Sequence, residues 1–356
     1  MNKLLPLTFL TALSFLKVIA QDASFSQISN TQIYSNPSAV IMNKRIVQVE
    51  MAYHKQWMGV DNGGFKTAYA SINMPFPSSG LGVGLSFMQD VEGIGNMKSQ
   101  FAKLTTRYNL IHAQAKSRHQ IIGAIDIGYA RKSINSSNLI FTDDLNPVFG
   151  VNNSTSDDVQ LAANFLDLGF SFTYANENMD LSRVLNNDMI KNYRIPVTVS
   201  FSAQHLNQPT ESLLGINTRL PVHYIATLAT AFTAKRPESV HLRRVMFQWE
   251  EQANINKYTV GAEVNLAGED KAVNVYVGGY YANSIATNGA NANTDAYVFL
   301  AGFETGKYDR YNICLSYDYN NRGLSTQSGG TIEITFNVAA KSLFKTIVNC
   351  FAYKRF

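Results

Sequence analysis

Histidines and paired acids are the residues of this chain whose chemistry could support catalysis or metal binding. The six histidines are scattered, and His112 with His119 lacks both the spacing and the carboxylates of a zinc site. The chain contains no G-x-S-x-G nucleophile motif and no H-E-x-x-H zinc motif. We therefore predict no catalytic residues, no metal ligands and no cofactor, and we expect the protein not to be an enzyme.

Two pairs of aspartates and the two cysteines each allow more than one interpretation. Asp143-Asp144 and Asp157-Asp158 lie in one polar stretch, where carboxylate oxygens would suit a calcium ion. Solvated acids of a surface loop explain the same pairs more simply, and we favour that interpretation. Cys314 and Cys350 could form a disulfide in an exported chain, or both could be free thiols, because the sequence does not place them near each other.

The composition limits the class of protein. Of the 356 residues, 46% are hydrophobic and 16% are charged, against about 25% charged in an average soluble domain. A disordered chain is excluded by the apolar content, and a disulfide scaffold is excluded by the presence of only two cysteines. The net charge of +4 comes without a stripe of lysine and arginine, so we expect no nucleic-acid partner.

Residues 1–20 are organised like a secretory signal peptide. Lys3 precedes a mostly apolar run from Leu4 to Leu16, and the small residue Ala20 stands where cleavage would fall. The alternative is an N-terminal membrane anchor, but the run is short for about 30 Å of hydrocarbon. We find no second uninterrupted apolar stretch of about 18 residues. The sequence therefore predicts an exported chain without helical membrane spans.

Much of the exported chain alternates between apolar and polar residues. Clear examples are residues 166–174, 193–204, 311–319 and 331–338. Successive side chains of a strand point to opposite faces, so each segment has one apolar wall and one polar wall. A half-buried sheet of a soluble sandwich would alternate in the same way.

Three features favour a transmembrane barrel over a soluble sandwich. The segments are about ten residues long, whereas soluble strands average about five or six. Aromatic residues cluster near the ends of the apolar walls, as in Tyr53 with Trp57 and Phe247 with Trp249, which suits an interfacial girdle. The polar walls consist of glycine, serine, threonine, asparagine and charged residues, which suit a wet lumen. We predict an all-β, transmembrane outer-membrane β-barrel.

The pattern predicts about fourteen antiparallel strands, and an even number is what single-chain bacterial barrels have. With both termini periplasmic, the odd-numbered connections face outside, where loops should be long. The long segments 135–164, 207–219, 283–294 and 320–330 fall outside, and the short turns 75–80, 235–239, 268–270 and 305–307 fall in the periplasm. The long segment 176–192 is an exception, either as a true periplasmic contact segment or as a slip in the count. The strands begin near Arg45, Phe65, Leu81, Gln100, His119, Phe165, Tyr193, His223, Val240, Lys257, Lys271, Asp295, Lys307 and Thr331.

Two segments flank the barrel, which we assign to residues 45–338. Residues 21–44 could lie inside the barrel as a partial plug or hang in the periplasm. Residues 339–356 could form a fifteenth crossing, but their alternation is poor and an odd count would break closure, so we expect a short periplasmic tail. Inside the barrel, the polar wall carries candidate lumen charges that either form a network or are simply solvated: Glu50, Arg107, Arg194 and Glu263.

Short motifs occur in order along the mature chain. Its opening, residues 22–27 with the sequence D-A-S-F-S-Q, is followed by N-P-S-A at 36–39 and by H-K-Q-W at 54–57. Further motifs are G-L-G-V-G at 80–84 with Asp90 and Gly93, S-A-Q-H-L at 202–206 with Pro209, H-Y-I at 223–225, S-Y-D-Y at 316–319 and G-T-I-E-I at 330–334. Together they resemble the PorP/SprF family of type IX secretion system outer-membrane proteins. The candidate family-motif positions are Asn36, Pro37, Gln56, Trp57, His205, His223, Asp318 and Glu333.

The resemblance has departures. His54 stands where the family has arginine, Ile332 stands where it has histidine, and the end of the chain with Cys350 and Arg355-Phe356 has a stretched spacing and lacks a proline. These departures leave the expected fold unchanged and put contacts made by the tail in doubt.

The resemblance implies a non-enzymatic barrel of the type IX secretion system, located in the outer membrane after export through the periplasm. Such a barrel would support secretion or cell-surface anchoring of a large adhesin-type cargo, including in gliding motility. Its implied partners are outer-membrane lipid, components of the secretion machinery and a secreted adhesin with a C-terminal sorting domain. The alternative is an outer-membrane transport channel for a small apolar or polar solute, and a third class is a barrel enzyme with a His and Asp pair at its rim.

Overall fold

The computed structural model describes most of the chain between residues 22 and 341. The described ranges are 22–40, 46–60, 64–93, 96–111, 119–134, 145–146, 150–151, 161–176, 197–211, 218–232, 240–266, 273–286, 294–306, 309–321 and 328–341. The expected signal peptide, Arg194, the two acidic pairs, Cys350 and the tail beyond residue 341 lie outside the described residues.

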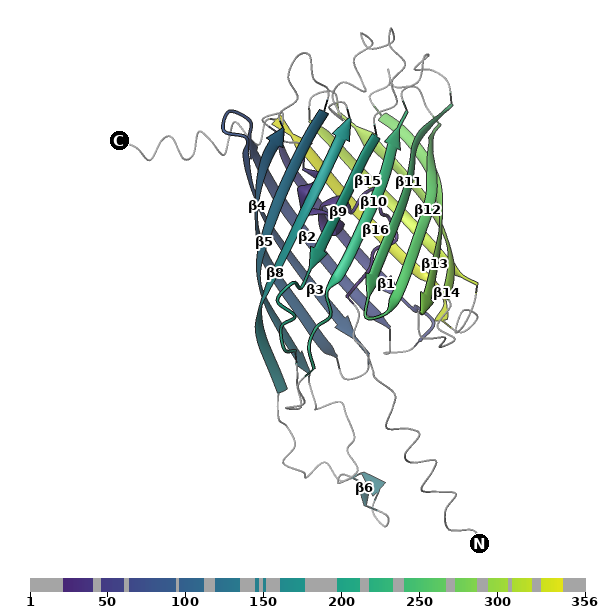
Figure 1. Cartoon of the computed structure of the whole chain (residues 1–356). Helices are drawn as coiled ribbons and strands as arrows, with labels where there is room; N and C mark the ends of the chain where they lie inside the picture. The colour runs from purple at the N-terminus through teal and green to yellow at the C-terminus, as the bar shows by residue number, and fades with distance from the viewer. Residues whose placement is uncertain are drawn as a thin grey trace, which may run out of the picture.

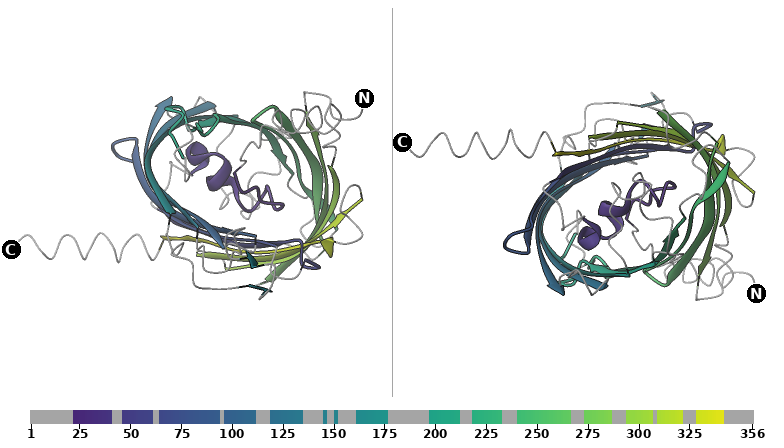
Figure 2. Two further views of the ribbon diagram at one scale, coloured as in Figure 1. Left: turned by 90° about the horizontal axis from the view of Figure 1, so that it is seen from below. Right: turned by 90° about the horizontal axis from the view of Figure 1, so that it is seen from above.

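Fourteen strands form a closed antiparallel barrel, in which each strand pairs with its neighbours in the chain and β1 pairs with β16 (Figures 1 and 2). A separate two-stranded hairpin, β6 and β7, lies outside the barrel. The strands are β1 (Val47–Gln56), β2 (Phe65–Phe76), β3 (Leu81–Glu92), β4 (Met97–Ile111), β5 (His119–Ile134), β6 (Leu145–Asn146), β7 (Gly150–Val151), β8 (Leu161–Asn176), β9 (Val197–Gln204), β10 (His223–Ala231), β11 (His241–Gln252), β12 (Ile255–Asn265), β13 (Val273–Ala286), β14 (Thr294–Thr305), β15 (Arg310–Asn320) and β16 (Thr331–Ala340).

The predicted fold class and strand number are confirmed. Five strands begin at the expected residue, namely Phe65, Leu81, His119, His223 and Thr331, and the other nine begin within four residues of it. The barrel runs two residues beyond the expected boundary at 338, because β16 continues to Ala340, where it pairs with Val47 of β1. Since fourteen strands are present, the long connection between β8 and β9 does not reflect a slip in the count.

The two ends of the barrel differ in their connections. We call the end that carries the connections after β1, β3, β5, β9, β11, β13 and β15 the loop end, and the opposite end the turn end. The hairpin β6–β7 belongs to the connection after β5 and lies at the loop end, at the bottom of Figure 1. The turn end carries the four-residue turn between β2 and β3.

The alternation sets which side chains face inward. Along β16, Glu333 and Thr335 are buried, whereas Ile332 and Ile334 are 38% and 45% exposed. Large apolar side chains are exposed in this way on all fourteen strands of the barrel, so its outer face is an apolar belt that suits hydrocarbon. No helix in the described part of the chain is long and apolar enough to span a membrane.

The lumen contains residues 22–40, which we call the plug (Figure 2). The plug includes one helical turn, α2 (Gln32–Ser35), and one 3-10 turn, η1 (Pro37–Ala39). Its first residue, Asp22, contacts residues at the loop end, and Ala39 and Val40 line a cavity at the turn end. The sequence placed both termini on the same side of the membrane. The described N-terminal residue instead lies at the opposite mouth from the end of β16, because the plug runs the length of the lumen before β1 begins.

Candidate functional site

The interface between the plug and the barrel wall is the most elaborate polar site among the described residues. Most plug side chains are buried, including Gln27 and Ser38 at 0% exposure. Asn36 and Pro37 shape its second turn: proline occupies the first helical position, where its missing N–H is not needed, and the Asn36 side chain accepts a hydrogen bond from the backbone N–H of Ser38. The plug therefore carries its own local structure into the lumen.

Two glutamates of the wall each bind two successive backbone amides of the plug. Glu333 on β16 accepts hydrogen bonds from the N–H groups of Ser26 and Gln27, at 2.7 and 3.1 Å. Glu50 on β1 accepts hydrogen bonds from those of Ile33 and Tyr34, both at 3.1 Å. A carboxylate that accepts two N–H groups satisfies donors that the plug would otherwise bury without partners. These contacts recognise backbone, so they fix the position of the plug.

Gln27 is the side chain of the plug with the most partners in the wall. Its amide nitrogen donates to the carbonyl of Glu333 at 3.0 Å and to the hydroxyl of Ser316 at 3.2 Å. Its amide oxygen accepts a hydrogen bond from the Thr335 hydroxyl at 2.8 Å. Beside it, the Ser26 hydroxyl donates to the carboxylate of Asp318. The first residues of the plug are thus bound to the last two strands of the barrel.

The second half of the plug is bound by strands β4, β8 and β9. Asn36 donates to the Thr173 hydroxyl at 2.7 Å, and the backbone N–H of Ser38 donates to the Ser171 hydroxyl at 3.0 Å. Arg107, at 1% exposure, donates to the carbonyl of Pro37. The same guanidinium donates to Asn73 on β2 at 2.7 Å, which holds the arginine against the wall.

An ion-pair cluster surrounds Asp22 at the loop end. Its carboxylate lies 2.6 Å from Nε2 of His205 and 3.2 Å from Nδ1 of His223. His205 also contacts Asp167 at 2.8 Å, and Asp167 contacts Lys103 at 3.0 Å. Burial alone would raise the pKa of the Asp22 carboxyl, but the two histidines hold it well below its usual value. Burial lowers and Asp22 raises the pKa of His205, and the net shift is upward.

Aromatic packing adds an apolar contact to these polar ones. The ring of Phe25 lies 4.8 Å from that of Tyr34 and 6.0 Å from that of Tyr69 on β2, and Tyr34 lies edge-on to Tyr69 at 5.2 Å. The three rings form a cluster in which two members come from the plug and one from the wall. The plug is therefore held by burial of apolar surface as well as by hydrogen bonds.

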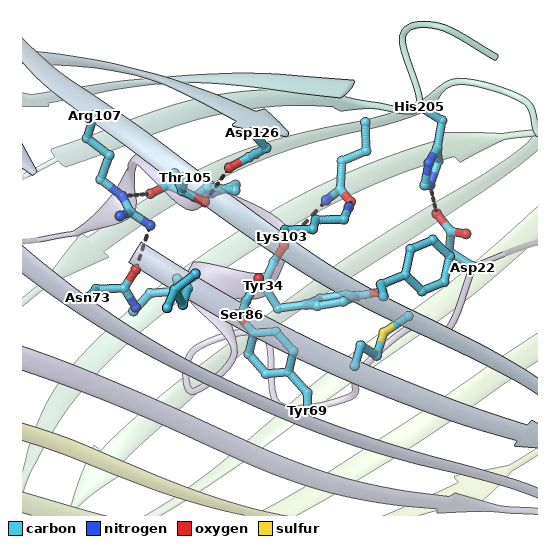
Figure 3. Close-up of a pocket in the computed structure, with 16 residues that line it drawn as sticks. Asp22, Tyr34, Tyr69, Asn73, Ser86, Lys103, Thr105, Arg107, Asp126 and His205 are labelled. Carbon is cyan, nitrogen blue, oxygen red and sulfur yellow. Dashed lines mark hydrogen bonds and ion pairs between the residues drawn. The ribbon is translucent and has the colours of Figure 1, made fainter. Parts of the chain in front are cut away.

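Cavities remain on both sides of the plug. One, with a free volume of about 40 Å³, lies between the plug and strands β2 to β5, where Tyr34 and Tyr69 face Lys103, Arg107 and Asp126 (Figure 3). The second, with a free volume of about 220 Å³, lies at the turn end. A β-bulge between Leu242 and Arg244 allows two consecutive arginines, Arg243 and Arg244, to line this second cavity.

The candidate lumen charges lie in different surroundings. Glu50 and Arg107 touch the plug, whereas Glu263 accepts a hydrogen bond from Tyr280 at 2.6 Å and lies 3.5 Å from Arg243. No group of three or more His, Cys, Asp or Glu side chains in the described residues is arranged to hold a metal ion. In the same part of the chain, the contacts around Asp22 join acids to histidines and lysine, and include no serine or cysteine bound to a histidine.

The structure brings six of the eight family-motif positions to the plug interface: Asn36, Pro37, His205, His223, Asp318 and Glu333. The other two lie at the loop-end rim, where Gln56 ends β1 and the Trp57 ring lies 4.8 Å from that of Phe65. Sequence reasoning missed Lys103 and Asp167, although both occupy polar positions of alternating strands. The alternation identifies both as lumen-facing side chains, but it does not indicate which lumen-facing side chains contact the plug.

The fold resembles known outer-membrane barrels at low identity. Similar solved structures are the CymD monoaromatic hydrocarbon channel (11% identity, TM-score 0.47, covering 90% of this chain and 94% of that one) and a Pseudomonas aeruginosa FadL homologue (12%, TM-score 0.48, covering 87% and 93%). CdiB from Acinetobacter baumannii is also similar (6%, TM-score 0.46, covering 83% and 60%). These likenesses concern the fold alone.

Sequence comparison gives the family. No curated protein matches the chain. The family model described as type IX secretion system membrane protein PorP/SprF matches residues 18–338, which include all fourteen strands of the barrel except the last two residues of β16. Because this match covers most of the chain, the chain belongs to the PorP/SprF family of type IX secretion system membrane proteins.

Proposed function

We propose that this barrel is a non-enzymatic component of the type IX secretion system that supports secretion or cell-surface anchoring of a large adhesin-type cargo. Its partners would be components of the secretion machinery and a cargo with a C-terminal sorting domain, in a system associated with gliding. The loop end would face the cell exterior and the turn end the periplasm. Export would follow cleavage of residues 1–20, leaving the tail after Ala340 in the periplasm.

The observation that supports this proposal best is the bound plug. Glu333 and Glu50 hold two separate parts of the plug by its backbone, and Arg107 holds a third through the Pro37 carbonyl. A lumen filled in this way suits a barrel that works through its outer surfaces and loops better than one that conducts solutes. In this proposal, a partner outside the cell would bind at the loop end, where the connection between β5 and β8 is the longest.

The proposal is tested by deleting the gene in the host and restoring either the wild-type chain or an empty vector. We expect the large surface cargo to be lost from the cell surface without this barrel and to return with the wild-type chain. The measurement is protease shaving of intact cells followed by mass spectrometry, with the culture medium analysed in parallel. Normal export and attachment of the cargo in the deletion strain would contradict the proposal.

A transport channel is the second candidate. The cavity at the turn end, with a free volume of about 220 Å³, combines the charged groups of Arg243 and Arg244 with the apolar side chain of Met246, and so could hold a small solute. Conductance in planar bilayers separates the two functions. We expect the wild type to be nearly silent and a Glu50→Gln/Glu333→Gln double variant, which weakens both carboxylate contacts, to conduct. A robust open pore in the wild type would favour transport.

A further inference from the structure

Four cationic side chains gather on the outer face of the barrel at the loop end. Lys55 lies near the end of β1, Lys66 near the start of β2, Lys98 near the start of β4 and Arg131 near the end of β5. All four occupy outward positions of the alternation, and Lys66, Lys98 and Arg131 are exposed. At about 4.8 Å per strand, the group spans about 19 Å of the wall. We call it the basic band.

The cations of the basic band repel one another without compensation. Lys55 lies directly opposite Lys66 in the register of β1 and β2, and like charges in that position destabilise a strand pair. Lys98 and Arg131 are diagonal neighbours, because Lys98 pairs with Ser133 and Arg131 pairs with Gln100. None of the four has a hydrogen-bond or ion-pair partner among the described residues. An anion bound at the band would relieve this repulsion.

The rest of the wall does not repeat the pattern. In the described strands β8 to β16, no lysine or arginine faces outward at the loop end; Lys257 points inward and contacts Glu250 of the lumen at 3.7 Å. On β11 the outward charge at this end is an acid, Glu251, next to the inward Glu250. Among the described strands, the outward-facing positive charge at the loop end therefore lies on one side of the barrel, which a general attraction to a membrane surface does not require.

An open hollow of about 570 Å³ lies in the outer face directly beside the basic band. Its row of outward side chains alternates in size across four strands, from Ala70 on β2 to Phe87, Ala102 and Tyr129. The two alanines leave troughs, and the aromatic rings of Phe87 and Tyr129, 57% and 53% exposed, stand beside them as ridges. At the edge of the hollow, where Arg131 of the band also lines it, Gln100 donates to Gln89 at 2.8 Å. From the loop end towards the middle of the barrel, the outer face thus presents first cations, then side-chain amides and then apolar troughs.

We propose that this wall is a binding site for a phosphorylated glycolipid of the outer leaflet. Its phosphate groups would lie on the basic band, its sugar hydroxyls near Gln89 and Gln100, and an acyl chain in the troughs of the hollow. The order of these groups from the loop end towards the middle of the barrel is the order in which such a lipid presents them. The site depends on the loop end facing outside, as proposed above, and is independent of the cargo.

The test measures binding of purified, delipidated barrel to vesicles of phosphatidylcholine that contain lipid A. Removing two cations, as in Lys55→Gln/Lys66→Gln or Lys98→Gln/Arg131→Gln, is expected to weaken binding about thirtyfold, since each cation near a lipid surface contributes about a factor of five. Arg219→Gln is the matched control, because Arg219 is an exposed cation of the loop between β9 and β10, outside the band. Lys98→Arg should retain wild-type binding.

A second measurement uses the wild type alone and so does not depend on the folding of any variant. Dephosphorylated lipid A should bind at least tenfold more weakly than lipid A itself. The proposal is overturned if the two lipids bind equally, if Arg219→Gln loses as much affinity as the double variants, or if vesicles with phosphatidylglycerol are preferred. It is also overturned if the double variants change the oligomeric state in detergent, because the band would then be a protein interface.

Discussion

Gly84 and Arg107 compete for the same space in the lumen: a Cβ atom placed on Gly84 would lie 2.6 Å from Nη1 of Arg107 and 2.2 Å from the side-chain oxygen of Asn73. Gly84 lies on β3 between the two strands that carry these side chains. The absence of a side chain there lets the guanidinium reach both Asn73 and the plug. The glycine-rich motif at residues 80–84 therefore has a steric role at the plug interface.

The Gly84→Ala variant is expected to be less stable than the wild type by about 1–3 kcal/mol, the usual cost of overpacking a tight site. Arg107 would have to move, and its hydrogen bonds to Asn73 and Pro37 would be lost. The measurement is urea unfolding of the barrel in detergent micelles, followed by tryptophan fluorescence. Gly123→Ala is the control, since a Cβ there meets only Leu110 at an ordinary 3.5 Å. Equal unfolding midpoints for both variants would contradict the steric role.

Replacing Phe25 with alanine tests the aromatic cluster between plug and wall. Phe25 is 3% exposed, and truncating a buried phenylalanine costs about 3–5 kcal/mol. We expect residues 22–40 to lose protection from protease while the barrel itself remains closed and heat-modifiable on gels. Phe299→Ala is the control, because Phe299 is 62% exposed on the outer face. Unchanged protection of the plug in the Phe25 variant would show that the polar contacts alone hold it.

The contact between Asp22 and His205 should depend on pH in a defined window. The pKa of Asp22 lies below its ordinary value of 3.8, so the contribution of this carboxylate is complete above that pH and is lost as the pH falls through the folded-state pKa. The pKa of His205 lies above its ordinary value of 6.5, so its contribution is complete below pH 6.5 and is lost as the pH rises through the folded-state pKa. The contact is therefore strongest between these two values.

Hydrogen exchange of the plug measures this window. After correction for intrinsic rates, the first residues of the plug should exchange more slowly at about pH 5.5 than at about pH 9. An Asp22→Asn variant should lose most of this difference, whereas Glu304→Gln, at the turn end and outside the Asp22 cluster, should keep it. A pH profile that is the same in Asp22→Asn and the wild type would assign the dependence to other groups.

The orientation of the barrel can be tested with two single cysteines in a Cys350→Ser background. Leu206 is 43% exposed in the connection after β9 at the loop end, and Ser79 is exposed in the turn between β2 and β3 at the turn end. A membrane-impermeant maleimide added to intact cells should label Leu206→Cys and spare Ser79→Cys until the cells are opened. The native Cys314 should stay unlabelled because it is 0% exposed. The reverse labelling would place the loop end in the periplasm.

The barrel was predictable from the sequence because its signal is local and repeated. A strand needs only alternating residues, and fourteen such strands with an even count permit closure. The plug was not predictable in the same way. Gln27 and Glu333 are 306 residues apart, and nothing in either segment indicates that a carboxylate of β16 accepts the backbone amide of residue 27.

The candidate functional residues also include some that local sequence reveals and some that it does not. Glu50, Arg107 and Glu263 were identifiable as polar-wall charges by their place in the alternation. Strict alternation would place one of Arg243 and Arg244 on the lipid side, and only the bulge in β11 brings both to the lumen cavity. Such an irregularity depends on the pairing of two strands, so no single segment of sequence reveals it.

The plug, near the start of the chain, is bound by strands near its end, and this has a consequence for biogenesis. Residues 26 and 27 are translated first, yet their hydrogen-bond partners on β15 and β16 are translated more than 280 residues later. The first residues of the plug therefore have no hydrogen-bond partners on β15 and β16 until these last strands have been made and have joined the barrel. In a protein cut short before β15, residues 26 and 27 would lack these partners and would be exposed to periplasmic proteases. Protection of the plug from protease is therefore a sign that the barrel has closed.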